Sequence, residues 1–322
     1  MEEILITGIT GFVGSHLADM CLAKGLRVHG LRRYHLSSMK NVKQIEKQIV
    51  WYDCDMLDPY SVNHMIKKIM PTRIFHMASQ SFVSPSWDHA SLYMDANYKM
   101  TVNLLNACLE AGINPKILIP GSGEEFGEVK EEELPITEKS ELKPVNPYAV
   151  TKVAQDMIGY VYFKSYGLNI IRTRAFNHEG PRREKVFGIP WYAYQIAMIE
   201  KGLQKKFMEV GHLDDRRSFT HVFDMVNAYW LATEKCDPGE LYLVGSENEN
   251  DVKTFREALE YMISKSTSKG IDYKVVKKYV RPTQVPFLIC NCEKFRKQTG
   301  WNPQFNFQRI IDDTLEFWRA NT

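Results

Sequence analysis

We predict an α/β protein in which a doubly wound parallel sheet is followed by a smaller mixed α/β domain. Between residues 4 and 180, short β-branched runs alternate with longer amphipathic segments, which is typical of βαβ units in a parallel sheet. After residue 180 this alternation becomes irregular. We therefore expect one domain over 1–180 and a second over 181–322, with parts of the second crossing back to the first.

Each element of the first domain is predicted from its own pattern. Short apolar runs predict strands at 4–6, 26–31, 49–52, 73–76, 116–119 and 169–173. Longer amphipathic runs predict helices at 12–21, 59–70, 88–110 and 147–166. The helix at 88–110 is supported by five residues spaced four apart, namely Leu92, Ala96, Met100, Leu104 and Cys108. In the second domain we expect strands at 240–244 and 272–276 and helices at 252–263 and 305–318.

The composition excludes several classes of protein. The 322 residues carry 41 Lys plus Arg against 39 Asp plus Glu, so the net charge of +2 gives no basic footprint for nucleic acid. Apolar runs stay well short of the roughly 20 residues that cross a bilayer, and the acidic N-terminal segment enters a strand pattern at once. Six cysteines occur without a CxxC pair, and Cys290 and Cys292 have no matching Cys or His pair nearby. We expect a cytoplasmic protein with no membrane partner, no nucleic-acid partner and no metal.

A glycine-rich turn follows the first predicted strand and opens the first predicted helix. It has the form GxxGxxG, with Gly8, Gly11 and Gly14 around Phe12 and Val13. Glycines at these positions let a diphosphate approach the backbone amides and the helix N-terminus, where a side chain would hold it away. The turn and its position between strand and helix predict a dinucleotide-binding (Rossmann) domain.

The residues after the second predicted strand indicate which of the two nicotinamide cofactors is bound. An acidic residue there binds the ribose hydroxyls of NAD, whereas an arginine accommodates the 2′-phosphate of NADP. This chain has Arg32 and Arg33 and no acid nearby, which favours NADP(H) and leaves NAD(H) as the alternative. Adenine and the middle of the cofactor are expected beside two pairs of residues that follow the third and fourth strands, Asp55 with Met56 and Ala78 with Ser79.

A serine, a tyrosine and a lysine form a candidate catalytic group. Tyr148 and Lys152 lie one turn apart on one predicted helix, and Ser122 follows the fifth strand. An ammonium group near a phenol lowers the phenol pKa, so Tyr148 can remove a hydroxyl proton while hydride leaves for nicotinamide. Ser122 can orient the same oxygen, and Tyr148 and Lys152 also lie where the cofactor binds. Two surface residues of a helix could show the same Y-x-x-x-K spacing by chance. The catalytic interpretation therefore depends on finding this pair together with the glycine turn and Ser122, in the expected order along the chain.

With these motifs the chain resembles the extended short-chain dehydrogenase/reductases of the sugar-nucleotide branch, in particular the families of GDP-mannose 4,6-dehydratase and GDP-6-deoxy-mannose reductase. The resemblance extends nearly from end to end and includes the segments 76–81, 146–148, 173–183, 211–219, 281–286 and 300–303. It implies that His178 and Arg183 bind the cofactor. It also implies that a GDP-sugar is held by Ser81, Asn177, Arg217 and Arg281.

The resemblance further implies a general base and an oligomer. Glu124 would remove the carbon 5 proton of a 4-keto sugar, after which water leaves carbon 6. We expect it on the same side of the chain as Ser122 if the backbone is extended there. The long helices at 88–110 and 147–166 form dimers in this family, which implies a homodimer or homotetramer with Tyr98, Met100 and Tyr160 at the interface or in the core.

Departures from the family pattern leave the reaction open. Gly123 stands where Ser is usual, Ser218 stands where Asp is usual, and the segment after Arg33 is short. A 4,6-dehydratase is the main prediction, and Glu124 is the residue that favours it. A 4-keto-6-deoxy-sugar reductase, a carbon 4 epimerase and a catalytically inactive NADP-dependent regulator are the alternatives.

Overall fold

The computed structural model describes residues 2–34 and 36–322. Within these residues seven strands form the main sheet, in the order β11-β6-β5-β4-β1-β2-β3. All neighbouring strands run parallel, which confirms the predicted doubly wound sheet. The strands are β1 (Glu3–Thr7), β2 (Arg27–Arg32), β3 (Val50–Asp53), β4 (Arg73–His76), β5 (Lys116–Ser122), β6 (Ile170–Ala175) and β11 (Leu241–Val244).

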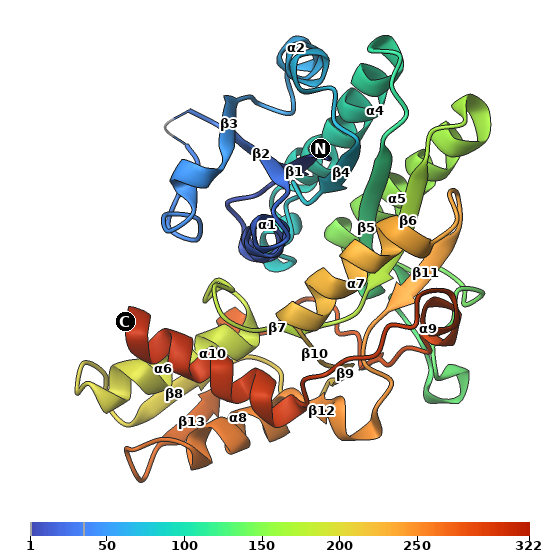
Figure 1. Cartoon of the computed structure of the whole chain (residues 1–322). Helices are drawn as coiled ribbons and strands as arrows, with labels where there is room; N and C mark the ends of the chain where they lie inside the picture. The colour runs from blue at the N-terminus through green and yellow to red at the C-terminus, as the bar shows by residue number, and fades with distance from the viewer. Residues whose placement is uncertain (1, 35) are drawn as a thin grey trace.

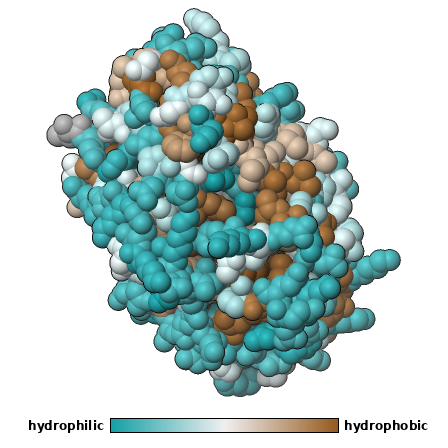
Figure 2. All heavy atoms as spheres, turned by 90° about the vertical axis from the view of Figure 1, so that its right-hand side faces the viewer, coloured by the Kyte–Doolittle hydropathy of each residue, from teal (hydrophilic) through white to brown (hydrophobic). Residues whose placement is uncertain are grey.

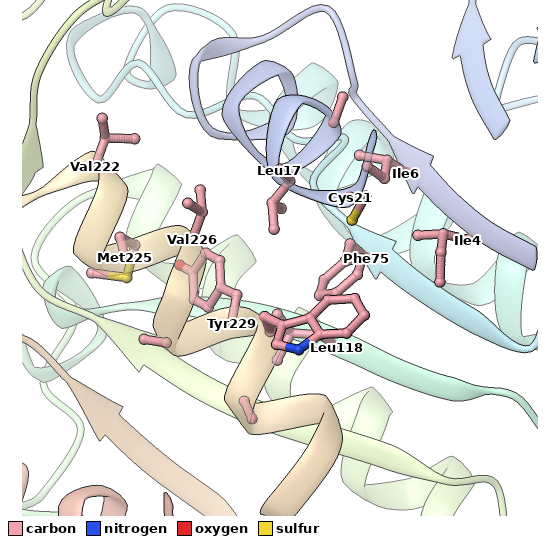
Figure 3. Packing of buried hydrophobic residues seen from close by; sticks show 14 of the residues in the cluster. Ile4, Ile6, Leu17, Cys21, Phe75, Leu118, Val222, Met225, Val226 and Tyr229 are labelled. Carbon is pink, nitrogen blue, oxygen red and sulfur yellow. The ribbon is translucent and has the colours of Figure 1, made fainter. Parts of the chain in front are cut away.

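Helices cover both faces of this sheet (Figure 1). One face carries α1 (Phe12–Ala23), α7 (Val222–Lys235) and α9 (Glu293–Thr299), and the other carries α2 (Pro59–Ile69), α4 (Met100–Glu110) and α5 (Pro147–Tyr166). Leu17 of α1 points toward Phe75 of β4 in the first of these interfaces (Figure 3), and the Phe75 ring stacks on Trp230 of α7 with 6.2 Å between centroids. Because the strands are buried on both faces, their apolar runs are nearly continuous.

The remaining elements form a smaller part below the main sheet (Figure 1). Its strands make three small sheets: β10 (Thr220–His221) with β7 (His178–Glu179), β8 (Phe207–Val210) with β13 (Asp272–Val275), and β9 (Arg216–Ser218) between β12 (Val252–Thr254) and β14 (Phe287–Leu288). Its helices are α6 (Gly188–Glu200), α8 (Phe255–Ser264) and α10 (Phe307–Asn321), which bury a core of their own. The elements α7, α9 and β11 follow residue 180 but pack with the main sheet. The boundary at residue 180 stays a prediction.

The helix predicted at 88–110 is interrupted. The chain forms α3 (Ala90–Met94), then a π-helical turn over Asp95–Lys99, and only then α4. Within this turn the buried Asn97 accepts hydrogen bonds from the Ser79 hydroxyl (2.9 Å) and the Gln80 amide (2.7 Å), and it donates to Thr151 (2.9 Å). A four-residue spacing cannot reveal these long-range bonds. The segment predicted as a helix at 252–263 also differs, because residues 252–254 form strand β12 before α8 begins.

Apolar side chains reach the surface along α5. Val150, Met157, Tyr160 and Val161 are exposed, and the face on that side of the molecule shows apolar patches among hydrophilic ones (Figure 2). Tyr98 and Met100, which we placed at an interface or in the core, are only partly exposed. No helix in the described part of the chain is long and apolar enough to cross a membrane.

Candidate active site

A cleft of about 760 Å³ opens at the carboxyl ends of the central strands. It lies where the strand order reverses between β1 and β4, the position at which doubly wound sheets bind ligands. Every predicted site residue except Arg217 lines it. Those residues are Gly8, Gly11, Phe12, Val13, Gly14, Arg32, Arg33, Asp55, Met56, Ala78, Ser79, Ser81, Ser122, Glu124, Tyr148, Lys152, Asn177, His178, Arg183 and Arg281.

The glycine turn between β1 and α1 has no room for side chains. Gly8 has a φ of 64°, and a Cβ atom there would lie 2.7 Å from the backbone nitrogen of Ala78. A Cβ atom on Gly14 would lie 2.4 Å from the Gly8 carbonyl oxygen. Gly11 precedes the first residue of α1, so the free amides of that helix face the cleft. The turn therefore fits a phosphate group, which needs close backbone approach.

Two arginines and a serine line the cleft at the end of β2 and in the loop that follows. The Arg32 guanidinium donates from Nε to Oδ1 of Asp53 on β3 at 2.9 Å. The Arg33 amide donates to the Ser37 hydroxyl at 2.9 Å, and this bond shapes the loop that follows. The cleft here is cationic, although Asp53 already pairs with one of the two positive charges.

A buried chain of hydrogen bonds supports the cleft wall after β4. The Ala78 amide donates to the Thr7 hydroxyl (3.0 Å), which bonds Nδ1 of His76 (2.9 Å), and His76 Nε2 bonds the Thr101 hydroxyl (3.0 Å). Burial lowers the pKa of His76 to about 3, so its ring is neutral near pH 7. Ser79 is held by Asn97 in the same wall. These bonds fix the backbone that faces the glycine turn.

Helix α5 brings Tyr148 next to Ser122. The Asn146 side chain caps α5 by accepting from the Ala149 amide at 2.8 Å, and Pro147 occupies its first position. Tyr148 is then the second residue of the helix and hydrogen-bonds the Ser122 side chain at the end of β5. Burial raises the pKa of Tyr148, and the bond to Ser122 acts in the opposite direction.

Lys152 lies one turn further along α5. Its ammonium group donates to the Pro120 carbonyl at 2.5 Å and to the Gln155 side chain. Burial lowers the pKa of Lys152 to about 8. In the protein alone burial dominates the pKa of Tyr148, and the ammonium group of Lys152 is directed to Pro120 and Gln155, so the effect of Lys152 on Tyr148 stays a prediction.

Glu124 lies in a 3₁₀ turn over Gly123–Phe126 and not in extended backbone, which corrects our assumption about this segment. Its carboxylate nevertheless lines the cleft. It accepts from Asn146 Nδ2 at 2.9 Å and pairs with Arg281 Nη1 at 3.4 Å. A Cβ atom on Gly123 would lie 3.2 Å from the Phe176 ring, so this ring accounts for the missing serine side chain.

The opposite wall carries Arg183 and His178. Arg183 pairs with Glu179 at 3.1 Å, donates to the His178 carbonyl and lies over the Phe187 ring at 4.0 Å. The His178 ring stacks on Phe12 with 5.9 Å between centroids. Burial lowers the pKa of His178 to about 4 and raises that of Glu179 to about 7.

Arg217 is the one predicted site residue that does not line the cleft, and its contact with a ligand stays a prediction. It is 2% exposed and pairs with Asp215 at 3.3 Å. The charges of Glu124 and Arg281 still reach it, so it lies behind their ion pair. Burial lowers the pKa of Arg217.

Sequence reasoning missed several residues that line the cleft. Glu179 lies within a segment that carried the family resemblance, so its position beside Arg183 was open to prediction. Phe187, Tyr229 and Phe255 gave no such signal, because they reach the cleft only through the packing of α6, α7 and α8. Among residues 2–34 and 36–322, no group of three or more His, Cys, Asp or Glu side chains is arranged to hold a metal ion.

Comparisons with known proteins identify the family of this chain. The family model for GDP-mannose 4,6 dehydratase matches residues 5–314. The chain is 30% identical to the human GDP-mannose 4,6 dehydratase over 98% of this chain and 92% of that protein. Among solved structures it is similar to RMD from Pseudomonas aeruginosa complexed with NADPH (26% identity, TM-score 0.86, all of both chains). It is also similar to a UDP-glucose 4-epimerase of Thermus thermophilus in complex with NAD (27% identity, TM-score 0.86, 99% of both chains). From the match over nearly its whole length, we conclude that the chain belongs to the GDP-mannose 4,6 dehydratase family.

Proposed function

We propose that the protein binds NADP(H) tightly and converts GDP-mannose, or a related GDP-hexose, to its 4-keto-6-deoxy product. The observation that carries the proposal is the position of Glu124 in the same cleft as Ser122 and Tyr148. This arrangement supports a role for Glu124 as a carboxylate base beside a group suited to oxidising a sugar hydroxyl. The family and the human relative support a GDP-sugar as the substrate.

The cofactor proposal rests on both ends of the cleft wall. The close-packed glycine turn, with the α1 amides facing the cleft, fits a diphosphate, and Arg32 and Arg33 fit the 2′-phosphate that distinguishes NADP from NAD. The Pseudomonas structure contains NADPH and the Thermus structure contains NAD, so NAD(H) is the alternative. When bound, the nicotinamide accepts a hydride and returns it. His178, Arg183 and Lys152 are the residues that would hold it opposite Tyr148.

The residues of this chain divide the proton transfers between them. Tyr148 takes the proton of the carbon 4 hydroxyl, and Ser122 orients that oxygen. Once carbon 4 is a ketone, the proton on carbon 5 becomes acidic, and Glu124 takes it. The same carboxyl group then protonates the hydroxyl that leaves carbon 6 as water. The hydride finishes on carbon 6 and the proton held by Tyr148 finishes on carbon 5, so the overall reaction is redox-neutral and no external reductant is consumed.

The substrate would lie between Glu124 and the arginine-rich wall. Arg281 is one-third exposed and can exchange its contact with Glu124 for a substrate phosphate oxygen. Asn177 and Ser81 line the same part of the cleft. Arg217, a residue of strand β9, would act from behind by adding positive charge.

A carbon 4 epimerase is the second candidate, and the Thermus epimerase structure is the observation that favours it. Epimerisation needs the same hydroxyl oxidation by Tyr148 but no base at carbon 5. A 4-keto-sugar reductase would also use Tyr148, and it would consume NADPH. The sugar product and the consumption of NADPH therefore distinguish these reactions.

Mass spectrometry of the nucleotide released on denaturation tests the cofactor, and incubation with a panel of nucleotide sugars tests the reaction. We expect NADP(H) to be released and GDP-mannose to be dehydrated without added reductant. Steady NADPH consumption with a 4-keto sugar, and no reaction with GDP-mannose, would establish the reductase instead.

The variant Glu124→Gln separates the two half-reactions. It should abolish water loss, because an amide cannot accept the carbon 5 proton, while cofactor binding stays unchanged. Glu128→Gln is the matched control, since Glu128 is exposed four residues away. Normal dehydration by Glu124→Gln would show that another group is the base.

We also propose that two copies associate through α4 and α5. The exposed Val150, Met157, Tyr160 and Val161 form one apolar surface on α5 that a second copy would cover. Light scattering coupled to size-exclusion chromatography should give a dimer or tetramer, and Val161→Glu should weaken it. A monomeric wild-type protein at micromolar concentration would contradict this.

A further inference from the structure

A buried charged cluster lies directly behind Ser122 and Lys152, and the mechanism above does not use it. The cluster consists of Glu125, Asp156, Arg172 and Arg174. Glu125 is fully buried, and Asp156 and Arg174 are each 2% exposed. Charged groups this deeply buried are costly unless their hydrogen bonds are satisfied, so each contact here is informative.

Glu125 connects this cluster to the catalytic serine. Its Oε1 accepts from the Ser122 amide at 2.7 Å, and its Oε2 accepts from Arg174 Nε at 2.8 Å. Arg174 Nη2 continues to Asp156 at 2.5 Å, and Asp156 also accepts from Arg172 at 2.8 Å. Because both oxygens of Glu125 accept hydrogen bonds, the contacts fit its ionised form.

The backbone leaves space for this carboxylate. A Cβ atom on Gly121 would lie 2.4 Å from Glu125 Oε1 and 2.8 Å from the Thr173 carbonyl oxygen. Gly121 immediately precedes Ser122 on β5. Glycine at this position therefore allows the carboxylate to reach the Ser122 amide.

The same cluster sets the electrostatic surroundings of Lys152. The negative charges of Glu125 and Asp156 favour the ammonium form of Lys152 and oppose the effect of burial. Burial raises the pKa of Glu125 to about 7, so above that pH the carboxylate is ionised. If Glu125 loses its charge, Arg172, Arg174 and Lys152 face only Asp156.

We infer that Glu125 is a positioning residue for the reaction proposed above, one that fixes the Ser122 backbone from behind and supplies negative charge near Lys152. It acts through these two residues because it is fully buried. The charged and titratable groups that face it are Arg174 from β6 and Lys152, Asp156 and Tyr148 from α5. The inference depends on the proposed function only for its effect on turnover.

The test compares Glu125→Gln with Asp156→Asn and Glu128→Gln above pH 7. Both buried substitutions remove one negative charge near Lys152, but only the first also weakens the contact with Ser122. We expect kcat of Glu125→Gln to fall on the order of 10-fold or more, with KM unchanged, because the serine moves. The basic limb of its kcat profile should move to lower pH, because Lys152 loses its proton more easily. Asp156→Asn should share the shift of the basic limb with a smaller loss of kcat.

A second measurement needs no substrate. Lysine labelled with ¹³C at Cε reports the titration of Lys152 by NMR, assigned with Lys152→Met, and we expect a lower pKa in Glu125→Gln. If the wild-type protein turns over no nucleotide sugar but this shift occurs, the proposed function fails and the electrostatic role of Glu125 stands. A folded Glu125→Gln with the kcat and Lys152 titration of Glu128→Gln would overturn the inference. If Glu125→Gln does not fold, Arg174→Lys is the second variant. It keeps all charges but loosens the contact that holds Glu125, so we expect a lower kcat. An unchanged kcat in Arg174→Lys would overturn the positioning role.

Discussion

The two walls of the cleft are built from different chemical groups. The wall formed by β1, α1 and the end of β4 presents backbone amides, glycines and small side chains, supported by neutral buried hydrogen bonds. The wall formed by residues after 175 presents arginines, carboxylates and aromatic rings. The first wall should be sensitive to added volume, and the second should be sensitive to lost charge. Substitutions of both kinds can test this difference.

The largest effect is expected for Gly8→Ala. The added methyl group would overlap the backbone at Met77 and Ala78, so the glycine turn must open. We expect turnover to fall on the order of 100-fold or more, with loss of NADPH binding measured by calorimetry. Gly25→Ala is the matched control, because Gly25 also has a positive φ, of 72°, but has open space around it. Equal losses of NADPH binding in the two variants would show that backbone strain and not volume is responsible.

Arg281→Gln should give the next largest effect, on the charged wall. Removing one charged hydrogen-bond donor to a phosphate should raise KM for the nucleotide sugar on the order of 10- to 100-fold. The affinity for NADPH should stay unchanged, since Arg281 lies beside Glu124 and away from the glycine turn. Arg309→Gln on the exposed side of α10 serves as the control. Weaker NADPH binding in Arg281→Gln would contradict the separation of the two walls.

The pH dependence of turnover should reflect Lys152, which lies between the walls. Burial lowers its pKa to about 8, so the ammonium group is lost as pH rises through that value. We expect kcat to fall about 10-fold for each pH unit well above this pKa. A stopped assay over pH 6.5 to 10 at constant ionic strength would measure it. A kcat that stays level up to pH 10 would show that the charge of Lys152 is not needed.

The smallest effect concerns stability in acid. His16 of α1 is buried and hydrogen-bonds the Pro181 carbonyl at 2.9 Å, and burial lowers its pKa to about 4. The folded pKa lies below the unfolded value of 6.5, so the stabilisation is full above pH 6.5 and is lost as pH falls toward 4. At pH 5 the loss is about 2 kcal/mol. Melting temperatures at pH 7.5 and 5 should therefore differ less for His16→Gln than for the wild-type protein, and equal differences would exclude His16 as a cause.

Local patterns predicted most of the first domain well. Strand β4 and helix α5 occupy the predicted residues, because their apolar runs, the Asn146 cap and the glycine after α5 are local signals. The turn at Gly8, Gly11 and Gly14 could also be predicted from a local pattern. Other groups can approach its backbone closely because glycines have no side chains, and the sequence shows this directly. The helix at 88–110 could not, because Asn97 bonds residues 17 and 54 positions away.

The sequence by itself determined the parallel sheet, the glycine turn and the motif positions of Ser122, Tyr148 and Lys152, because each depends on periodicity or on short spacing. Only the tertiary structure decided which groups the charged side chains face. It directed Lys152 to Pro120 and Gln155, buried Arg217 behind the cleft and joined Glu125 to Ser122. The physical reason is that burial and charge pairing depend on the distances between segments that are far apart in the chain, and no local pattern contains those distances.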